Sequence, residues 1–281
     1  MYEELLKLCG FEAEEIEKER PRIDKAFKIA EIGPEDIKQG ESRIKEYFDI
    51  ELLGVRKMVG IWMKQFIDLV LAREENKYVS YACFPAVNIV IATMNVASKD
   101  VYCVSPEMII DMVMGQIFDK LTPILEVAEE HGLPPGLGMC SLNQARLGSI
   151  VKGIAPMPDM LLSWDMLCDQ SPKLDELIHE SYGVPVMYID NCQDAGKGKY
   201  PEINPRNIGY AAQEIKSSLE GIQKLTGIEI TEEALHTARV GNARLWLGMN
   251  QVWELKKADP VPLSWVNLAP FYFLLASPER R

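Results

Sequence analysis

Hydrophobic residues recur along the first part of the chain with the spacing of one helix face. Six of them follow one another at steps of three and four residues: Leu52, Val55, Val59, Trp62, Phe66 and Leu69. This spacing places them on one side of an α-helix whose other sides carry charged residues. The pattern predicts a helical N-terminal region over residues 1–77, with an apolar stripe that packs on a neighbouring domain or subunit.

From about residue 78 the pattern changes to short β-rich runs separated by helical stretches. The runs are Tyr78–Ala82, Val101–Val104, a short run into Met139, Met160–Ser163 and Val184–Ile189. Strands that alternate with helices predict an α/β fold with a mostly parallel, doubly wound sheet. We place this α/β domain at residues 78–206.

Two helices of this domain have recognisable starts. The segment from Ser141 to Gln144 has the form of a capping box, in which the serine accepts a backbone N–H and the glutamine reaches back. Ser171 followed by Pro172 predicts an N-cap with proline at the first helical position, and Asp175 falls in the first turn, where the helix dipole favours it.

The C-terminal part is expected to be helical over residues 207–281. One helix is predicted from Ile208 to Leu225, closed by Gly227, and a second begins at the N-cap candidate Thr231 and reaches Lys256 or Lys257. The tail from Trp265 to Leu275 is apolar and must be covered. Together with the stripe from Leu52 to Leu69, it predicts contacts with other subunits, since large exposed apolar patches mark interaction sites.

Charge and hydropathy exclude several classes of partner. The formal net charge is −12, whereas nucleic-acid binding needs clustered cations that release counterions from phosphates. No stretch approaches the roughly 18 consecutive apolar residues of a membrane helix, and the N-terminus lacks the features of a signal peptide. We therefore expect a cytoplasmic protein with neither nucleic acid nor a membrane as partner.

The six cysteines include three that share a position. Cys140, Cys168 and Cys192 each follow a predicted parallel strand, and the loops at the carboxyl ends of such strands gather ligands. A thiolate at Cys140 would be stabilised by the positive end of the following helix. No Cys-x-x-Cys pair occurs, so zinc-ribbon and thioredoxin-like patterns do not fit. Three such thiolates are compatible with an iron–sulfur cluster held between strand ends, and the alternative is three unrelated buried cysteines.

Several runs resemble the 2-hydroxyacyl-CoA dehydratase and class I benzoyl-CoA reductase family. They are Gly138–Gly148, which contains Cys140, Pro158–Asp169, which contains Cys168, Tyr182–Asp190 and Leu225–Leu235. The resemblance extends over about residues 78–257. It implies a Rossmann-like domain, a [4Fe–4S] cluster ligated by Cys140 and Cys168, and an ATP-hydrolysing activator protein that donates low-potential electrons.

The sequence also departs from the family pattern. Family subunits are usually longer, with a second Rossmann-like domain that donates the third cysteine; here the helical segment 207–281 leads toward a second domain that is absent, and Cys192 is the substitute candidate. The family tends to carry a Pro-x-Glu-Leu-like segment near the substrate, where this chain has Phe84–Ile89 without a carboxylate. Asp165 and Asp169 could compensate, although capping or supporting contacts explain them more simply.

Two functions follow from different premises. The resemblance implies an iron–sulfur subunit of a 2-hydroxyacyl-CoA dehydratase or benzoyl-CoA reductase type enzyme, relaying single electrons for radical chemistry on a CoA thioester. It would work in a hetero-oligomer with a homologous partner subunit, and the missing carboxylate predicts that acyl-CoA binds mainly to that partner. The alternative is a metal-free scaffold or assembly subunit of the same fold, with cysteines buried in apolar cores.

Overall fold

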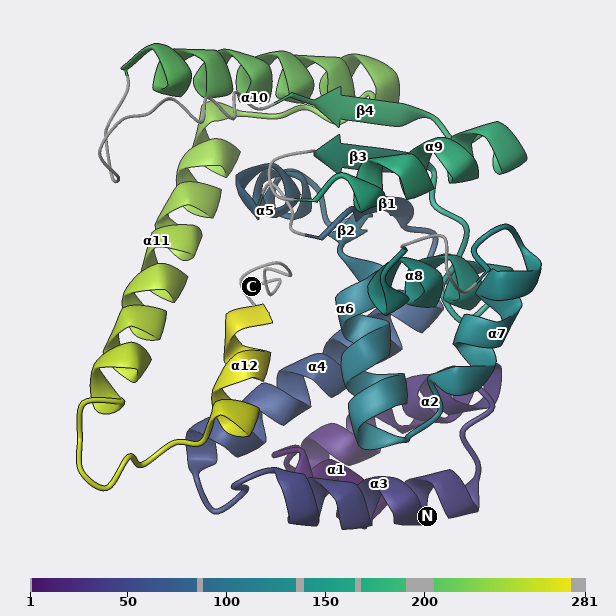
Figure 1. The fold of residues 1–281 in the computed structure, drawn as a ribbon, viewed down its shortest axis with the longest axis vertical. Coiled ribbons are helices and arrows are strands. Elements are labelled where there is room, and N and C mark those ends of the chain that lie inside the picture. Colours follow the sequence, from purple (N-terminus) through teal and green to yellow (C-terminus); the bar gives the residue numbers. More distant parts are fainter. Residues whose placement is uncertain (1, 85–87, 135–138, 165–167, 191–204, 274–281) are drawn as a thin grey trace.

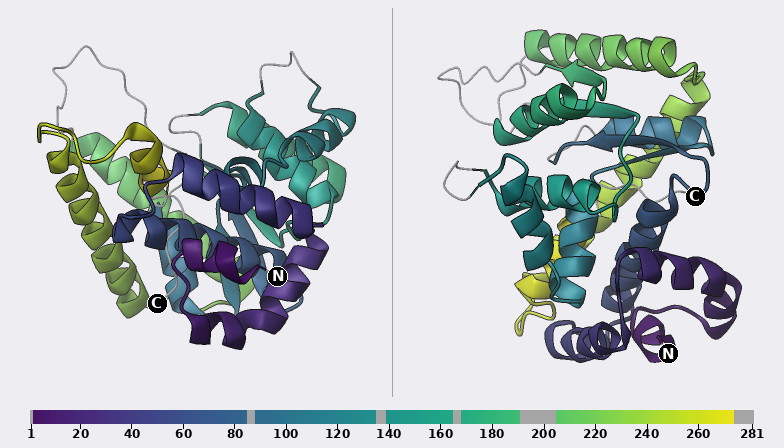
Figure 2. Two further views of the ribbon diagram at one scale, coloured as in Figure 1. Left: turned by 90° about the horizontal axis from the view of Figure 1, so that it is seen from below. Right: turned by 90° about the vertical axis from the view of Figure 1, so that its right-hand side faces the viewer.

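The structure, a computed structural model, describes residues 2–84, 88–134, 139–164, 168–190 and 205–273. The N-terminal region consists of helices α1 (Glu3–Leu8), α2 (Ala13–Ile29), α3 (Pro34–Tyr47) and α4 (Leu53–Leu71). These helices lie at one end of the molecule, and α10 lies at the opposite end (Figures 1 and 2). Among the described residues, no helix has the length and apolar character that crossing a membrane requires.

The centre of the molecule is a parallel sheet with helices in its connections. Its strands are β1 (Tyr78–Ala82), β2 (Val101–Val104), β3 (Met160–Trp164) and β4 (Val186–Ile189). They lie in the order β2-β1-β3-β4, and all neighbouring pairs are parallel. The helical segments between them are α5 (Asn88–Ala97), α6 (Pro106–Ile110), a π-helix (Asp111–Ile117), α7 (Thr122–Glu130), α8 (Ser141–Val151) and α9 (Gln170–Tyr182).

Alternate residues of the strands face two separate cores. Val79, Tyr81 and Tyr102 belong to a large core shared with α4, α6, α8 and α9. Ala82 and Cys103 belong to a smaller core shared with α5 and α10. This alternation follows from the two-residue period of a strand, and burial on both faces explains why the strands read as nearly continuous apolar runs.

The C-terminal helices are α10 (Pro205–Thr226), α11 (Glu232–Leu255) and α12 (Trp265–Phe273). Of the three, α10 and α11 cover the smaller core, whereas α12 packs on α4. α10 runs beside β4, and α11 packs on α5 before it extends away from the sheet (Figure 1). The chain leaves α10 at Gly227, whose φ of +70° is accessible to glycine at little cost. Thr231 caps α11 by accepting the Ala234 N–H at 3.1 Å.

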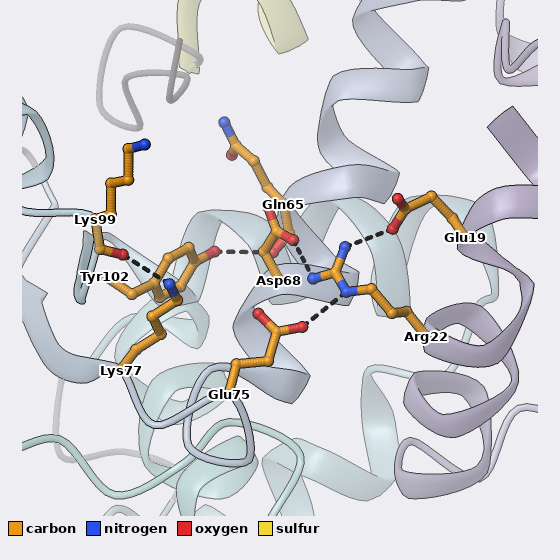
Figure 3. A network of polar contacts seen from close by, with 8 residues as sticks. All are labelled: Glu19, Arg22, Gln65, Asp68, Glu75, Lys77, Lys99 and Tyr102. Carbon is orange, nitrogen blue, oxygen red and sulfur yellow. Dashed lines mark hydrogen bonds and ion pairs between the residues drawn. The ribbon is translucent and has the colours of Figure 1, made fainter.

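Polar contacts tie the N-terminal helices to each other and to the sheet (Figure 3). Arg22 of α2 forms three ion pairs of 2.7 Å, with the carboxylates of Glu19, Asp68 and Glu75. Asp68 belongs to α4 and Glu75 follows it, so one guanidinium fastens α2 to α4. The hydroxyl of Tyr102 on β2 donates to the backbone oxygen of Gln65 on α4 at 2.9 Å, which joins the helices to the sheet.

The structure confirms most of the predicted elements and corrects two expectations. The strands at residues 78, 101, 160 and 186 are present, as are the Gly227 end and the Thr231 cap. Met139, however, lies in no strand, and residues 135–138 are outside the described chain. The stripe is also covered within this chain: Val55, Val59, Trp62, Phe66 and Leu69 are buried, and Leu52 alone of the six is exposed. It therefore provides no contact surface for another subunit.

Candidate active site

The candidate site lies at the carboxyl ends of two neighbouring strands, β1 and β3. The connections that follow these strands lead to opposite edges of the sheet. β1 leads through α5 to β2 on one side, whereas β3 leads through α9 to β4 on the other. Such a change of direction between β1 and β3 opens a crevice at the carboxyl ends of parallel strands, and ligands bind there in open α/β sheets. α8 and α9 contact each other near this point of the sheet.

Cys140 is exposed and occupies the N-cap of α8. Its backbone N–H donates to Gln170 Oε1 at 2.8 Å, which joins the start of α8 to the start of α9. The predicted capping box is wrong: Ser141 is already inside the helix, and Gln144 Nε2 donates instead to the backbone oxygen of Leu133 at 3.0 Å. The expectation that Cys140 follows a strand directly is also wrong, because neither it nor Met139 belongs to one.

Cys168 is half-buried and precedes α9 by two residues. The predicted helix start is displaced, since Asp169 takes the N-cap position and Ser171 is already helical. The Ser171 hydroxyl is therefore free of the capping role and lies 3.7 Å from Cys168 Sγ. Like Cys140, Cys168 is a free thiol that borders a helix N-terminus.

The remaining candidates do not join these two cysteines in the described chain. Cys192 and Asp165 lie outside the described residues. Asp169 forms an exposed ion pair with Lys173 at 2.9 Å, and Asp190 accepts a hydrogen bond from the Tyr210 hydroxyl at 2.5 Å. In the described ranges, no group of three or more histidine, cysteine or acidic side chains is arranged to hold a metal ion.

A buried ionic cluster joins α6, α8 and α9, and it was not predicted from the sequence. Arg146 of α8 and Asp175 of α9 form an ion pair of 2.8 Å with no exposed side-chain surface. Glu107 of α6 is also buried, and its Oε1 accepts the Phe84 N–H at 2.6 Å, just beyond β1. The single positive charge of Arg146 cannot neutralise both carboxylates. Burial is therefore expected to shift the pKa values of the two carboxyl groups.

The pKa shifts in this cluster have burial as their main cause. Burial raises the pKa of Asp175 to about 6, although the guanidinium of Arg146 opposes this shift. Burial likewise raises the pKa of Glu107, again against the attraction of Arg146. For Arg146 itself burial lowers the pKa, but the two carboxylates outweigh this effect and the guanidinium stays charged. The sequence contained only a weak signal of this cluster. Arg146 and Asn143 follow the spacing of the buried face of α8, whereas an arginine on the protein surface would not follow that spacing.

Cys83 is a buried thiol that joins the carboxyl ends of two neighbouring strands. Its sulfur accepts the Trp164 N–H at 3.3 Å and lies 3.5 Å from the Trp164 oxygen, so it links the ends of β1 and β3. Burial raises the pKa of this thiol to about 12, with a further contribution from Asp175. The neutral form is therefore stable, whereas metal ligation requires a thiolate.

Cys140 and Cys168 have the chemistry that an iron–sulfur cluster requires. Thiolate sulfur is the usual donor to such clusters. Both thiols are free and neither is fully buried. Each borders the first turn of a helix, where unpaired backbone N–H groups stabilise negative charge. As far as the chain is described, the donor chemistry of these two residues fits the cluster that the resemblance implies.

Comparison with known proteins gives one assignment. None of the curated proteins compared with the sequence matches it significantly. Residues 101–280 match the family described as 2-hydroxyglutaryl-CoA dehydratase, D-component. The match includes β2, β3, β4 and both cysteines of the crevice, so the resemblance noted in the sequence is confirmed. The chain belongs to the 2-hydroxyglutaryl-CoA dehydratase D-component family.

Proposed function

We propose that this chain is the iron–sulfur subunit of a 2-hydroxyacyl-CoA dehydratase-type enzyme. Membership of the family makes it a subunit of an enzyme of this type. The observation that carries the iron–sulfur role is the pair of free cysteines, Cys140 and Cys168, at the starts of two contacting helices beside the crevice. Cys168 follows strand β3, and the hydrogen bond from the Cys140 N–H to Gln170 ties Cys140 to the same helix start.

The residues of the crevice have separate tasks in this proposal. Cys140 and Cys168 hold a [4Fe–4S] cluster, with Cys192 as the candidate third ligand. When bound, the cluster supplies single electrons of low potential for chemistry on a CoA thioester. The first-turn amides of α8 and α9 stabilise the anionic sulfurs, and Gln170 holds the two helix starts together through the Cys140 N–H.

The proposal extends to partners and to a division of labour. The subunit works in a hetero-oligomer with a homologous partner subunit and receives its electrons from an ATP-dependent activator protein. Acyl-CoA binds mainly to the partner subunit. Phe84 is the first residue of the segment without a carboxylate, and residues 85–87 lie outside the described chain. Benzoyl-CoA reduction is the alternative reaction for the same electron relay.

Replacement of Cys140 or Cys168 by serine should lower the iron and sulfide content of the anaerobically purified protein to a small fraction of the wild-type value. A serine hydroxyl is a poor substitute for thiolate, the donor that such clusters prefer. Iron and acid-labile sulfide analysis, together with the visible spectrum, provides the measurement.

Cys9→Ala and Cys103→Ala are the control variants, because both cysteines are buried in apolar cores away from the crevice. Their iron content should equal that of the wild type. Undiminished iron in both serine variants would contradict the assignment. A colourless wild-type protein, purified without oxygen, would favour the metal-free assembly subunit.

A further inference from the structure

Ser171 connects the segments that surround the crevice. It is 3% exposed and lies in the first turn of α9. Its Oγ is 3.0 Å from the Phe84 oxygen, 3.2 Å from Asn143 Oδ1 and 3.7 Å from Cys168 Sγ. Its backbone oxygen accepts a hydrogen bond from Arg146 Nη2 at 3.3 Å, and Asp175 holds Arg146 in place at 2.8 Å. The position of the hydroxyl is thus fixed by buried partners.

The hydroxyl has one proton and three neighbouring acceptors. Asn143 is 1% exposed, and in the described chain its Nδ2 has no hydrogen-bond partner. Turning this amide by 180° exchanges its oxygen and nitrogen and lets Nδ2 donate to Ser171 Oγ. The serine proton is then shared between the Phe84 oxygen and Cys168 Sγ. Asn143 thereby acts as a donor to the serine rather than as a competitor for its proton.

The charge of Cys168 decides which acceptor receives the proton. A neutral thiol is a weak acceptor, so the hydroxyl then donates to the Phe84 oxygen. A thiolate bound to iron carries negative charge, and hydrogen bonds to ionised acceptors are roughly twice as strong as neutral ones. The hydroxyl needs only to rotate about its own C–O bond to reach the sulfur, since its oxygen is already at 3.7 Å.

We propose that Ser171 is a positioning residue whose hydroxyl donates a hydrogen bond to the Cys168 sulfur and raises the reduction potential of the cluster held there. The inference rests on the proposed function of Cys168 as a ligand. Reduction adds negative charge to the cluster, so a donor at the sulfur stabilises the reduced state more than the oxidised state. Hydrogen bonds to sulfur are one of the factors that set such potentials.

The test measures the midpoint potential of the cluster by a redox titration followed by EPR. Ser171→Ala should shift the potential to more negative values with the iron content unchanged. Ser171→Thr retains the hydroxyl and should restore the potential toward the wild-type value. Ser149→Ala is the matched control, because Ser149 is also fully buried and its hydroxyl donates to the Arg146 oxygen at 2.9 Å without contact with a cysteine.

Two further results separate this inference from its premise. Equal potentials in the wild type, Ser171→Ala and Ser149→Ala, all with full iron content, would overturn the role of Ser171 alone. A wild-type chain that binds no iron would overturn the proposed function and this inference with it. If the alanine variant fails to fold, as circular dichroism would reveal, Ser171→Cys replaces it. Its thiol has a similar volume but is a weaker donor, so the same negative shift is expected and an unchanged potential would overturn the role.

Discussion

Arg146 is a buried cation that pairs with the carboxylate of Asp175 and attracts that of Glu107. Removal of one partner from a buried ionic cluster typically costs about 3–5 kcal/mol, because the remaining charge stays without compensation. Arg146→Met should therefore lower the free energy of unfolding by about this amount near neutral pH. Chemical denaturation followed by circular dichroism would measure it.

The loss of unfolding free energy in Arg146→Met should increase as the pH rises. Burial raises the pKa of Asp175 to about 6, and Arg146 limits this shift. Without the guanidinium, the folded variant retains the Asp175 proton to higher pH, whereas the unfolded chain releases it near its ordinary pKa of about 4. Since the unfolded state then binds fewer protons, each pH unit above about 6 costs up to about 1.4 kcal/mol. The difference from the wild type should grow between pH 6 and pH 8.

Lys173→Met is the control for this pH series, because Lys173 forms an exposed ion pair with Asp169 on the same helix. Exposed pairs contribute little to stability, so its unfolding free energy should follow the wild-type pH profile. A constant difference between Arg146→Met and the wild type over this range would contradict the assigned coupling between Arg146 and Asp175.

The candidate cysteines were selected from the sequence by local position. Cys140 and Cys168 were chosen because both were expected to follow strands and both occur in runs that resemble the family, and their role as ligands stays a prediction. Arg146 and Asp175 were not found, because their pairing depends on the packing of α8 against α9. The sequence placed Asp175 in a first helical turn as a dipole contact, whereas α9 begins at Gln170 and has no acidic residue in its first turn.

Among the helices, α7 approaches closely to α8, the helix that begins after Cys140. A Cβ atom added at Gly148 of α8 would lie 1.9 Å from the backbone oxygen of Ile124 in α7. Gly148→Ala should therefore separate the two helices and lower the unfolding free energy by about 1–3 kcal/mol or more, as overpacked cores do. Thermal and chemical denaturation would measure this loss.

Gly241 of α11 provides the opposite case within the same chain. A Cβ atom there would meet no atom within 4 Å. Gly241→Ala should raise stability by about 0.5–1 kcal/mol, since alanine is the better helix former. Equal changes in unfolding free energy for the two alanine variants would contradict this explanation. They would show that the close approach of α7 and α8 does not exclude a side chain at position 148.

Strand positions followed from the sequence more reliably than helix starts. Buried parallel strands are short apolar runs, and Tyr78–Ala82 and Val101–Val104 have the predicted ends. Ser141 and Ser171 were misread because serine before a helix suggests a cap, whereas the tertiary contacts of Gln144 and Ser171 outweighed the local motif. The boundaries at residues 77 and 206 stay a prediction.

At the scale of the whole molecule, exposed apolar side chains collect on the last two helices. The α11–α12 apolar surface consists of residues between 39% and 63% exposed: Trp246, Leu247, Trp253, Leu255, Trp265 and Val266. The rings of Trp253 and Trp265 lie 6.1 Å apart and join the two helices. Figure 1 shows α11 and α12 beside each other, away from the sheet. Large exposed aromatic groups are typical of subunit contacts.

Leu247→Glu should weaken the association of this chain with other subunits, because it introduces a charge into the most exposed part of this surface. Sedimentation at low micromolar concentration should find the wild-type chain associated and the variant shifted toward the monomer. Leu225→Glu is the control, since Leu225 is 50% exposed at the end of α10, outside the surface. A wild-type chain that sediments as a well-behaved monomer would contradict the expected role.

The packing of α11 on α5 has a consequence for the order of events during synthesis. The ribosome produces α5 before α11, and Asp49 must likewise wait for Asn267, which donates to it at 2.7 Å. Until then the side of α5 that α11 covers remains open to water on the nascent chain. Such transiently exposed apolar surface is what chaperones bind. The four strands are thus translated before α11, the helix that packs on α5.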